Sequence, residues 1–548
     1  AAHRLPIRLR PSPSGRAVTI GNMSVLLRSL IEKRPEKGHE PALVDDDGTT
    51  SWADLDDRVN RLIHHLRDDR GVQPGDRIAL LSGNRREVYE VLLAAAHSGI
   101  LVVPINWHFA AEEVEYVVDD SGSTLLIADP EYAGNATGVS VPTISFGDEW
   151  ERLLAASHGD EPAEQSMGGV MFYTSGTTGR PKGVRNTAFT GGVPPEVYQL
   201  MAAGMVNLGF PPDGRTLLCG PHYHSAQWAF TFFPMIGGSS VIMQRRFVPE
   251  QTLELIDEHA VTNVHLVPTQ FVRLLRVDAE RRERFRGDSL QLVLHGAAPC
   301  SPTVKRQMIE WWGPSVTEYY GATEGGVVSV ISAEEWMAKP GSVGKPMANM
   351  IVKIVPEDDD DPAPSDGASG DGQPIDDQGN VAYRPGTIHV RNTMGADFEY
   401  LNEPDKTRDA HRIDGMFTLG DIGYLDEDGY LYLSDRKIDM IISGGENIYP
   451  AEIEGVLAGH PSVVDVAVFG VPDEEFGEQV KAAVQLAPGH DWDAELERSL
   501  DAYAREHLAG YKAPRSYDVV ETMPRSEAGK LLKRQLRAPY WEGVGRAI

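Results

Sequence analysis

Short apolar runs alternate along this chain with segments in which apolar residues recur at the helical period. Strands that alternate with helices favour parallel pairing, because each crossover helix returns the chain to the same edge of the sheet. The sequence therefore predicts an α/β fold with parallel-rich sheets. Its strands are predicted over 77–81, 100–104, 216–219, 239–243, 263–267 and 292–294, and its helices include 85–96 and 253–259.

The length of the chain predicts more than one domain. At 548 residues it exceeds what one hydrophobic core usually organises. A β-rich segment ends near Leu433 and a polar stretch follows, so we divide the chain into 1–437, a large domain of several subdomains, and 438–548. The second domain is predicted to be a small α+β unit. Its strands are expected over 440–442, 463–468 and 480–486, and its helices over 451–457 and 492–508.

Charge and cysteine content narrow the classes of function. The formal net charge is −30, which opposes binding to nucleic acid or to an anionic membrane. Part of the charge lies in 357–380, an Asp-, Gly- and Pro-rich tract predicted to be an acidic surface insertion. Cys219 and Cys300 are too far apart for a disulfide framework or a CxxC metal site. With no secretory signal and no membrane anchor recognised, we expect a cytoplasmic protein.

The segment from Tyr173 to Val184 is the strongest chemical signal. It follows the apolar run Gly169–Phe172 and contains glycines, hydroxyl side chains and the cations Arg180 and Lys182. Glycines allow backbone N–H groups to approach an anion, and hydroxyls and cations add donors and charge, so this composition fits a polyphosphate cradle. The spacing is not that of a P-loop. From composition alone, a mobile surface loop is an equal alternative.

The ten residues from Thr174 to Gly183 resemble the signature loop of the adenylate-forming superfamily. That superfamily includes acyl-CoA synthetases, luciferases and the adenylation domains of peptide synthetases. Further family motifs follow in the expected order over roughly residues 40–540, and the chain is most like an acyl-CoA synthetase. The resemblance implies ATP, Mg²⁺ and coenzyme A as cofactors, and a small mobile C-terminal lid that carries the catalytic lysine, Lys530.

The resemblance also assigns roles in nucleotide binding. Tyr320 would stack on adenine, and Glu324 would bind Mg²⁺ as a hard oxygen ligand. Asp421, an acceptor-only carboxylate, would hold the ribose hydroxyls. The implied catalytic residues are Lys530, Glu324, Thr323, Lys182 and His224. The implied cofactor-binding residues are Thr174, Ser175, Gly176, Thr177, Thr178, Gly179, Gly296, Ala297, Ala298, Tyr320, Asp421, Arg436, Gly444 and Gly445.

The acyl pocket is expected near the Pro221-His222-Tyr223-His224 motif. By resemblance His224 lines the carboxylate and acyl site, whereas a His-x-His metal pair lacks a third ligand and a buried structural histidine remains an alternative. Trp228 and the apolar lining favour a hydrophobic acid over acetate, with fatty, aryl and alicyclic acids left open. The expected lining residues are His224, Gln227, Trp228, Val267, Ala322 and Val327.

One position departs from the family pattern. The hinge residue, usually Asp, Lys or Gln in the family, is Ile438 here. A β-branched apolar residue restricts local rotation and would hamper movement at the hinge. This would affect the second half-reaction, thioester formation, more than the first, adenylation.

The expected reaction is ATP-dependent conversion of a hydrophobic carboxylic acid to an acyl adenylate with release of pyrophosphate, followed by thioester formation with coenzyme A. An adenylation-only enzyme that passes its product to a separate ligase or carrier protein is one alternative. A luciferase-like oxidation and a non-catalytic nucleotide or acyl binder are the others. No nucleic-acid partner is expected, and a homodimer is left open.

Overall fold

The computed structural model describes residues 26–174, 181–187, 195–298, 300–355, 385–413, 415–436, 439–443, 446–473, 476–508, 510–525 and 531–542. The predicted acidic insertion, 357–380, lies outside them. Within these residues the strands form four sheets, three in the larger part of the molecule and one in a C-terminal unit. No helix in the described ranges combines the length and the apolar character that crossing a bilayer requires.

The N-terminal sheet is wholly parallel and has the order β6-β5-β3-β4-β7. Its strands are β3 (Arg77–Leu81), β4 (Leu101–Ile105), β5 (Leu125–Ala128), β6 (Thr143–Ser145) and β7 (Gly169–Val170). The helices of this region are α1 (Leu27–Lys33), α2 (Trp52–His64), α3 (Arg86–Ser98), α4 (Ala111–Ser121) and α5 (Asp148–Ala156). This region confirms the predicted alternation of strands with helices.

The largest sheet changes from parallel to antiparallel pairing along its width. Strands β1, β11, β10, β12, β13 and β14 pair in parallel, with β2 antiparallel at one edge. From β15 onward, through β16, β21, β20, β18 and β17, the pairing is antiparallel. The β-rich segment expected before residue 434 is therefore the antiparallel half of the same sheet.

The strands of this sheet are β1 (Pro41–Asp45), β2 (Gly48–Ser51), β10 (Arg215–Leu218), β11 (Ser240–Met243), β12 (Asn263–Leu266), β13 (Leu292–His295), β14 (Val316–Ala322), β15 (Gly326–Ser332), β16 (Ser342–Pro346), β17 (Met350–Val355), β18 (Gly386–Asn392), β20 (Phe417–Leu425) and β21 (Leu431–Arg436). The helices of this part are α6 (Val197–Asn207), α7 (Ser225–Ile236), α8 (Pro249–Glu258), α9 (Pro268–Leu275), α10 (Ala279–Arg284), α11 (Pro302–Trp312), α12 (Ala333–Ala338) and α13 (Pro404–Ala410).

The apolar run predicted as one strand, Gly169–Phe172, divides between two sheets. β7 ends at Val170 and pairs with β4, whereas β8 (Phe172–Thr174) forms a hairpin with β9 (Lys182–Asn186). Strand β19 (Phe398–Tyr400) completes this three-stranded antiparallel sheet by pairing with β9. The four residues form one continuous apolar run, so periodicity did not predict this division. Met171 still donates its N–H to the Val102 carbonyl at 2.9 Å, and the chain then leaves the parallel sheet.

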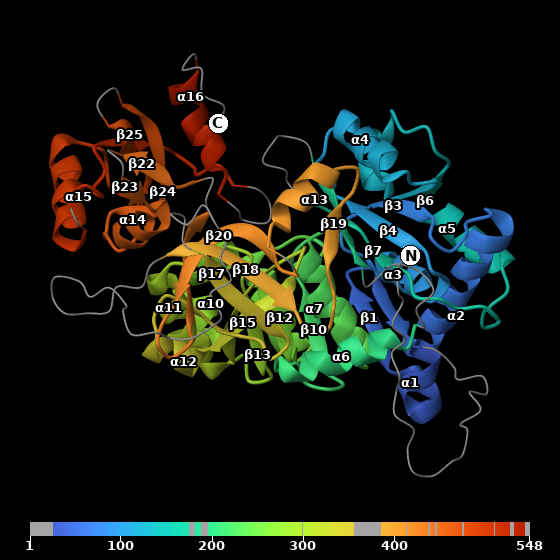
Figure 1. The fold of residues 1–548 in the computed structure, drawn as a ribbon. Coiled ribbons are helices and arrows are strands. Elements are labelled where there is room, and N and C mark those ends of the chain that lie inside the picture. The colour runs from blue at the N-terminus through green and yellow to red at the C-terminus, as the bar shows by residue number, and fades with distance from the viewer. Residues whose placement is uncertain are drawn as a thin grey trace, which may run out of the picture.

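The C-terminal unit is the small α+β structure that the sequence predicted. Its sheet has the order β23-β22-β25-β24, with β26 parallel to β25. Figure 1 shows this unit at the upper left, apart from the N-terminal sheet. Its elements are β22 (Ile441–Ser443), β23 (Glu446–Ile448), α14 (Pro450–Leu457), β24 (Val463–Asp473), β25 (Gly477–Leu486), α15 (Ala494–His507), β26 (Ser516–Val519) and α16 (Lys533–Trp541). The predicted fold class is confirmed, while the mobility of this unit stays a prediction.

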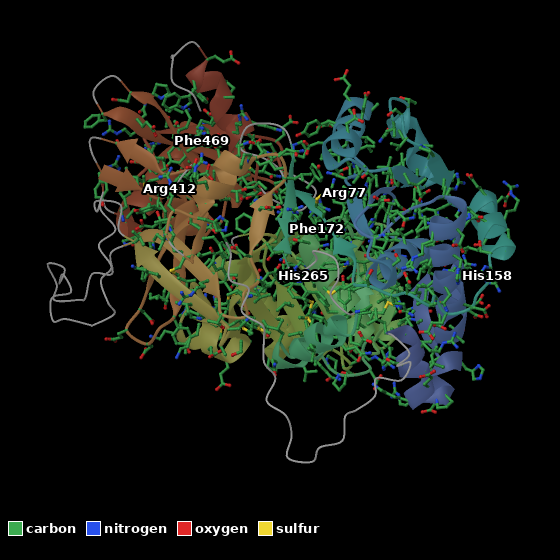
Figure 2. The ribbon with its side chains drawn as sticks, turned by 45° about the vertical axis from the view of Figure 1, so that its right-hand side comes forward. Arg77, His158, Phe172, His265, Arg412 and Phe469 are labelled. Atoms are coloured by element: carbon green, nitrogen blue, oxygen red, sulfur yellow. The ribbon has the colours of Figure 1, made fainter. Side chains whose placement is uncertain are left out.

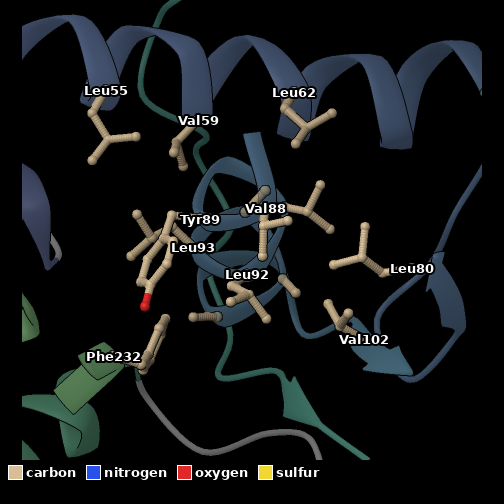
Figure 3. Packing of buried hydrophobic residues seen from close by; sticks show 14 of the residues in the cluster. Leu55, Val59, Leu62, Leu80, Val88, Tyr89, Leu92, Leu93, Val102 and Phe232 are labelled. Atoms are coloured by element: carbon tan, nitrogen blue, oxygen red, sulfur yellow. The ribbon is translucent and has the colours of Figure 1, made fainter. Parts of the chain in front are cut away.

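Helices α2 and α3 build the core of the N-terminal region (Figure 3). Ser51 caps α2 by accepting the N–H of Asp54, and the helix then presents Leu55, Val59 and Leu62 on one face, as the spacing of three and four residues requires. These side chains are buried in one cluster with Val88, Tyr89, Leu92 and Leu93 of α3, Leu80 of β3 and Val102 of β4. The Tyr89 hydroxyl bonds Thr231 of α7, which connects this core to the large sheet.

This packing predicts a large loss of stability for Leu93→Ala, since Leu93 is 0% exposed. We expect a decrease of about 2–5 kcal/mol in the free energy of unfolding, because the substitution removes buried methyl groups and leaves a cavity. Leu200→Ala is the control, because Leu200 is 73% exposed and should change stability by less than about 0.5 kcal/mol. Urea unfolding would measure both, and equal destabilisation of the two variants would contradict the packing shown in Figure 3.

Candidate active site

The predicted site residues gather where the parallel strands of the large sheet end. Open α/β sheets bind ligands at the carboxyl ends of their strands. Gly296 follows β13, Thr323 follows β14, and His224 precedes α7 after strand β10. The Ser225 and Thr323 hydroxyls are 2.7 Å apart, so the start of α7 and the end of β14 are in direct contact.

Tyr320 and Asp421 form one half of this site. The Tyr320 hydroxyl donates to Oδ2 of Asp421 at 2.7 Å, and the two side chains are 7% and 8% exposed. Tyr320 belongs to β14 and Asp421 to β20, 101 residues later. Asp421 is also paired in register with Arg436 across β20 and β21. The sequence predicted these three residues in one site, and the Tyr320–Asp421 hydrogen bond and the Asp421–Arg436 strand pairing connect them.

Glu324 and Lys182 form the other half of the site, and both contact Tyr400. The Tyr400 hydroxyl donates to Oε1 of Glu324 at 3.0 Å, and Nζ of Lys182 lies 5.5 Å from the centre of the Tyr400 ring. Tyr400 belongs to β19, which pairs with β9, the strand of Lys182. Sequence analysis missed Tyr400, because no local spacing connects position 400 to 182 or 324.

The charge around Lys182 is balanced by three further groups. Burial lowers the pKa of Lys182, as does the neighbouring ammonium of Lys406, whereas the carboxylates of Glu403 and Glu324 oppose both effects. Lys406 is itself paired with Glu403. An incoming polyphosphate would find two ammonium groups here, and only the lysine at position 182 was recognised from the sequence.

The hairpin of β8 and β9 presents Thr174 directly opposite Lys182. The Tyr173 hydroxyl donates to Asp120 at 2.7 Å, and the Tyr116 hydroxyl donates to the Pro181 carbonyl at 3.3 Å, so α4 contacts the hairpin on both sides of its loop. The remaining predicted residues of the phosphate loop and lid lie outside the described residues. They are Ser175, Gly176, Thr177, Thr178, Gly179, Ile438, Gly444, Gly445 and Lys530.

The segment after β13 approaches β14 closely. A Cβ atom at Gly296 would lie 2.6 Å from both the Tyr319 ring and the Tyr319 carbonyl, so only glycine fits there. The next residue, Ala297, has φ of 65°, which is the left-handed region that side chains disfavour. Ala298 is partly buried beside it. These small residues keep the chain close to Tyr319 and Tyr320, as the predicted adenine segment requires.

His224 and Gln227 differ in what their polar atoms contact. Nε2 of His224 is buried without a hydrogen-bond partner among the described residues, and burial lowers the pKa of His224 to about 4. The imidazole is therefore neutral near pH 7. The Gln227 amide instead lies within the core, with its nitrogen 2.8 Å from Nδ1 of His265 and its oxygen 3.3 Å from the Gly220 nitrogen.

The other predicted acyl-pocket residues lie around the same sheet edge. Trp228 is buried and its ring lies 5.6, 5.3 and 5.1 Å from those of Phe172, Phe232 and Phe233. Val267 follows β12, Ala322 ends β14, and Val327 of β15 packs against the cluster that contains Tyr319. Figure 2 labels His265 and Phe172 near the middle of the view, and both side chains are buried.

A buried ion pair lies behind the predicted adenine segment. Lys305 of α11 bonds Glu318 of β14, and Nε2 of His295 is 4.0 Å from the same carboxylate. Burial raises the pKa of Glu318 and lowers that of Lys305, while their mutual attraction opposes both changes. Lys305 also lies 4.7 Å from the centre of the Trp336 ring. Sequence analysis gave no signal for this pair.

Removal of one partner should be strongly destabilising. Lys305→Met leaves the Glu318 carboxylate buried without its cation, so we expect about 3–5 kcal/mol less unfolding free energy. The double variant Lys305→Met with Glu318→Gln removes both charges and should be less destabilised than the single variant. Urea unfolding of both tests this, and a double variant as unstable as Lys305→Met would contradict the proposed cause.

The comparisons with known proteins agree with this geometry. Residues 31–373 match the family model described as AMP-binding enzyme, and residues 452–530 match the AMP-binding enzyme C-terminal domain. A feruloyl-CoA synthase of Amycolatopsis sp is 33% identical, over 89% of this chain and 94% of its own length. A fatty acid–[acyl-carrier-protein] ligase, ScoC, of Streptomyces coeruleorubidus is 29% identical, over 93% of this chain and 95% of its own.

A solved structure of the o-succinylbenzoate CoA synthetase (MenE) from Bacillus subtilis, in complex with its acyl-adenylate intermediate, has the same fold. The TM-score is 0.76 at 30% identity, and the match covers 94% of this chain and 98% of that one. The first family model contains the motifs around Lys182, His224, Gly296 and Tyr320 that meet at the sheet edge. The chain therefore belongs to the AMP-binding, adenylate-forming enzyme family.

Proposed function

We propose that this protein is an AMP-forming acid–thiol ligase. It activates a hydrophobic carboxylic acid with ATP to give an acyl adenylate and pyrophosphate, and then transfers the acyl group to coenzyme A. The observation that carries the proposal is the convergence at one sheet edge of the Tyr320–Asp421 pair and the Glu324–Tyr400–Lys182 group, beside His224. Family membership supports the same reaction.

The Tyr320–Asp421 pair would bind the nucleoside. Gly296, Ala297 and Ala298 are small residues against which a flat base could pack, and the Tyr320 ring would offer a face to it. The Asp421 carboxylate is an acceptor-only group, which suits ribose hydroxyls. Arg436 would add a cation from the neighbouring strand.

Glu324, Thr323 and Lys182 would act on the phosphates. Carboxylate and hydroxyl oxygens are the hard donors that Mg²⁺ prefers, so Glu324 and Thr323 fit such an ion, which would neutralise phosphate charge when bound. The β8–β9 hairpin would hold the β- and γ-phosphates, with Lys182 where β9 leaves the loop and the segment 174–179 around them. Glu324 is held towards the hairpin by Tyr400.

The adenylation step is an in-line attack of a carboxylate oxygen of the acid on the α-phosphorus, with pyrophosphate as the leaving group. Such a step needs positioning and charge neutralisation rather than a protein nucleophile. The neutral His224 imidazole can orient the acid by one N–H, and Lys530 would neutralise charge on the α-phosphate and the carboxylate. Trp228, Val267, Ala322 and Val327 would surround the body of the acid.

Thioester formation would follow with the C-terminal unit in a second orientation. The lid loop that contains Gly444 and Gly445 would then line the path of the coenzyme A thiol to the acyl carbonyl. One relative is named as an acyl-carrier-protein ligase, so a carrier protein in place of coenzyme A is the alternative acyl acceptor. The relatives named for ferulate, succinylbenzoate and fatty acids all take acids with a hydrophobic body, which agrees with the expected pocket.

The first test is a paired assay of pyrophosphate release and acyl-CoA formation with fatty, aryl and alicyclic acids. Lys530→Ala should lower pyrophosphate release by roughly 10²- to 10³-fold, because it removes a charge directed at the transition state. Lys512→Ala is a matched control, since that lysine belongs to the same unit but pairs with Glu452. Pyrophosphate release by Lys530→Ala at the wild-type rate would overturn the assigned role.

A second test concerns Ile438. Ile438→Asp should leave pyrophosphate release unchanged and increase acyl-CoA formation, because aspartate lacks the β-branched apolar side chain that restricts rotation. Ile438→Val keeps the branch and is the matched control, with no change expected in either signal. An unchanged thioester rate in Ile438→Asp would count against the hinge hypothesis. Acyl adenylate without acyl-CoA in the wild type would instead favour the adenylation-only alternative.

A further inference from the structure

A cluster of potential metal ligands lies far from the active site, where α2 ends. His64 is the last residue of α2, Asp68 belongs to the π-helix His65–Asp69 that continues it, and His158 follows α5. One ligand atom from each of these three residues lies within 4.8 Å of the other two. Figure 2 places His158 at the edge of the molecule, well away from His265 and Phe172.

The hydrogen bonds of His64 fix its tautomer and leave a mismatch. Nε2 of His64 is 2.9 Å from the Asp160 carbonyl, which can only accept, so this nitrogen carries the proton. Nδ1 then has a lone pair, yet it lies 3.2 Å from Oδ2 of Asp68, which is also an acceptor. Two acceptors face each other at this distance only when a cation, either a proton or a metal ion, lies between them.

The neighbouring histidine, His65, has a complementary hydrogen-bond partner at each ring nitrogen. Nδ1 of His65 is 2.8 Å from Asp69, and Nε2 of His65 accepts from Nε of Arg70 at 3.1 Å. The two ring nitrogens of His65 thus contact one acceptor, Asp69, and one donor, Arg70. The same spacing of four residues thus gives His65 one acceptor and one donor as partners, whereas both ring nitrogens of His64 face acceptors.

The surroundings of His64 favour a metal ion over a proton. A ligating histidine usually donates its other ring N–H to a carbonyl or carboxylate, as His64 does to Asp160. The separation of 3.2 Å between Nδ1 and Oδ2 is close to the distance between two ligands of a tetrahedral ion bound at about 2.0 Å. The ring of His158 lies 4.2 Å from that of His64, and this exposed side chain can turn to supply a third ligand.

We propose that His64, Asp68 and His158 form a binding site for a divalent transition metal. Two imidazoles and one carboxylate suit Zn²⁺, Co²⁺, Ni²⁺ or Cu²⁺ rather than Mg²⁺ or Ca²⁺, and water completes the coordination. The ion connects the end of α2 to the segment after α5, two parts of the chain that are 94 residues apart. It therefore stabilises the N-terminal region and has no part in adenylation.

The test is titration of the tag-free, full-length protein with Zn²⁺ by calorimetry and with Co²⁺ by visible absorption, in an excess of Mg²⁺. The wild type should bind one ion at this site, with an intense Co²⁺ spectrum typical of low coordination number. His158→Ala and Asp68→Asn should each weaken Zn²⁺ binding by at least about 10-fold. Zn²⁺ should also raise the melting temperature of the wild type more than that of His158→Ala.

Asp69→Asn is the matched control, because Asp68 and Asp69 are 62% and 60% exposed and each pairs with the histidine four residues before it. This variant should bind Zn²⁺ as the wild type does. If the wild type binds no more tightly than His158→Ala and Asp68→Asn, the charge at His64 is a proton and the proposal is overturned. Equal weakening by Asp68→Asn and Asp69→Asn would overturn it as well. Pyrophosphate release is measured in parallel and should be the same in all variants.

Discussion

The parallel pairing of β12, β13 and β14 is the constraint on which the rest of the molecule depends. Parallel strands end at a common edge, so the loops that follow them are brought together whatever their separation in sequence. Gly296 and Thr323 meet at this edge for that reason, and the start of α7 joins them through Ser225. The close approach of Gly296 to Tyr319 shows how tightly two of these ends are packed.

The antiparallel half of the large sheet and the three-stranded sheet complete the site. Strand β20 brings Asp421 to Tyr320, and β19 brings Tyr400 between Glu324 and Lys182. Each connection is a polar contact between segments that are remote in sequence, and each uses a group that could bind part of a nucleotide. A site assembled from two sheets can hold a base, a ribose and phosphates at fixed separations, which is the requirement of catalysis by positioning.

Much of this arrangement followed from the sequence. The six strands predicted for the parallel sheets lie within one residue of their predicted positions, because short apolar runs bounded by turn residues specify buried strands directly. Strands β1, β5, β6 and β14 of these sheets were not predicted. The nucleotide motifs at Tyr320, Glu324 and Asp421 were found because each carries a dense local pattern. Other features were missed because they have no local pattern. The division of Gly169–Phe172 between two sheets, the Lys305–Glu318 pair and Tyr400 all depend on partners that are distant in the chain.

The sequence by itself determined the family, the alternation of strands with helices and the identity of the chemical groups, since each is written in residue type and short-range spacing. Only the tertiary structure decided which groups face one another. It directs the Gln227 amide to His265 in the core and leaves Nε2 of His224 without a partner among the residues that the structure describes. It also places two acceptors at the ring of His64 but one acceptor and one donor at that of His65. The physical reason is that a polar atom's partner is set by where the backbone places distant segments, which local propensity does not encode.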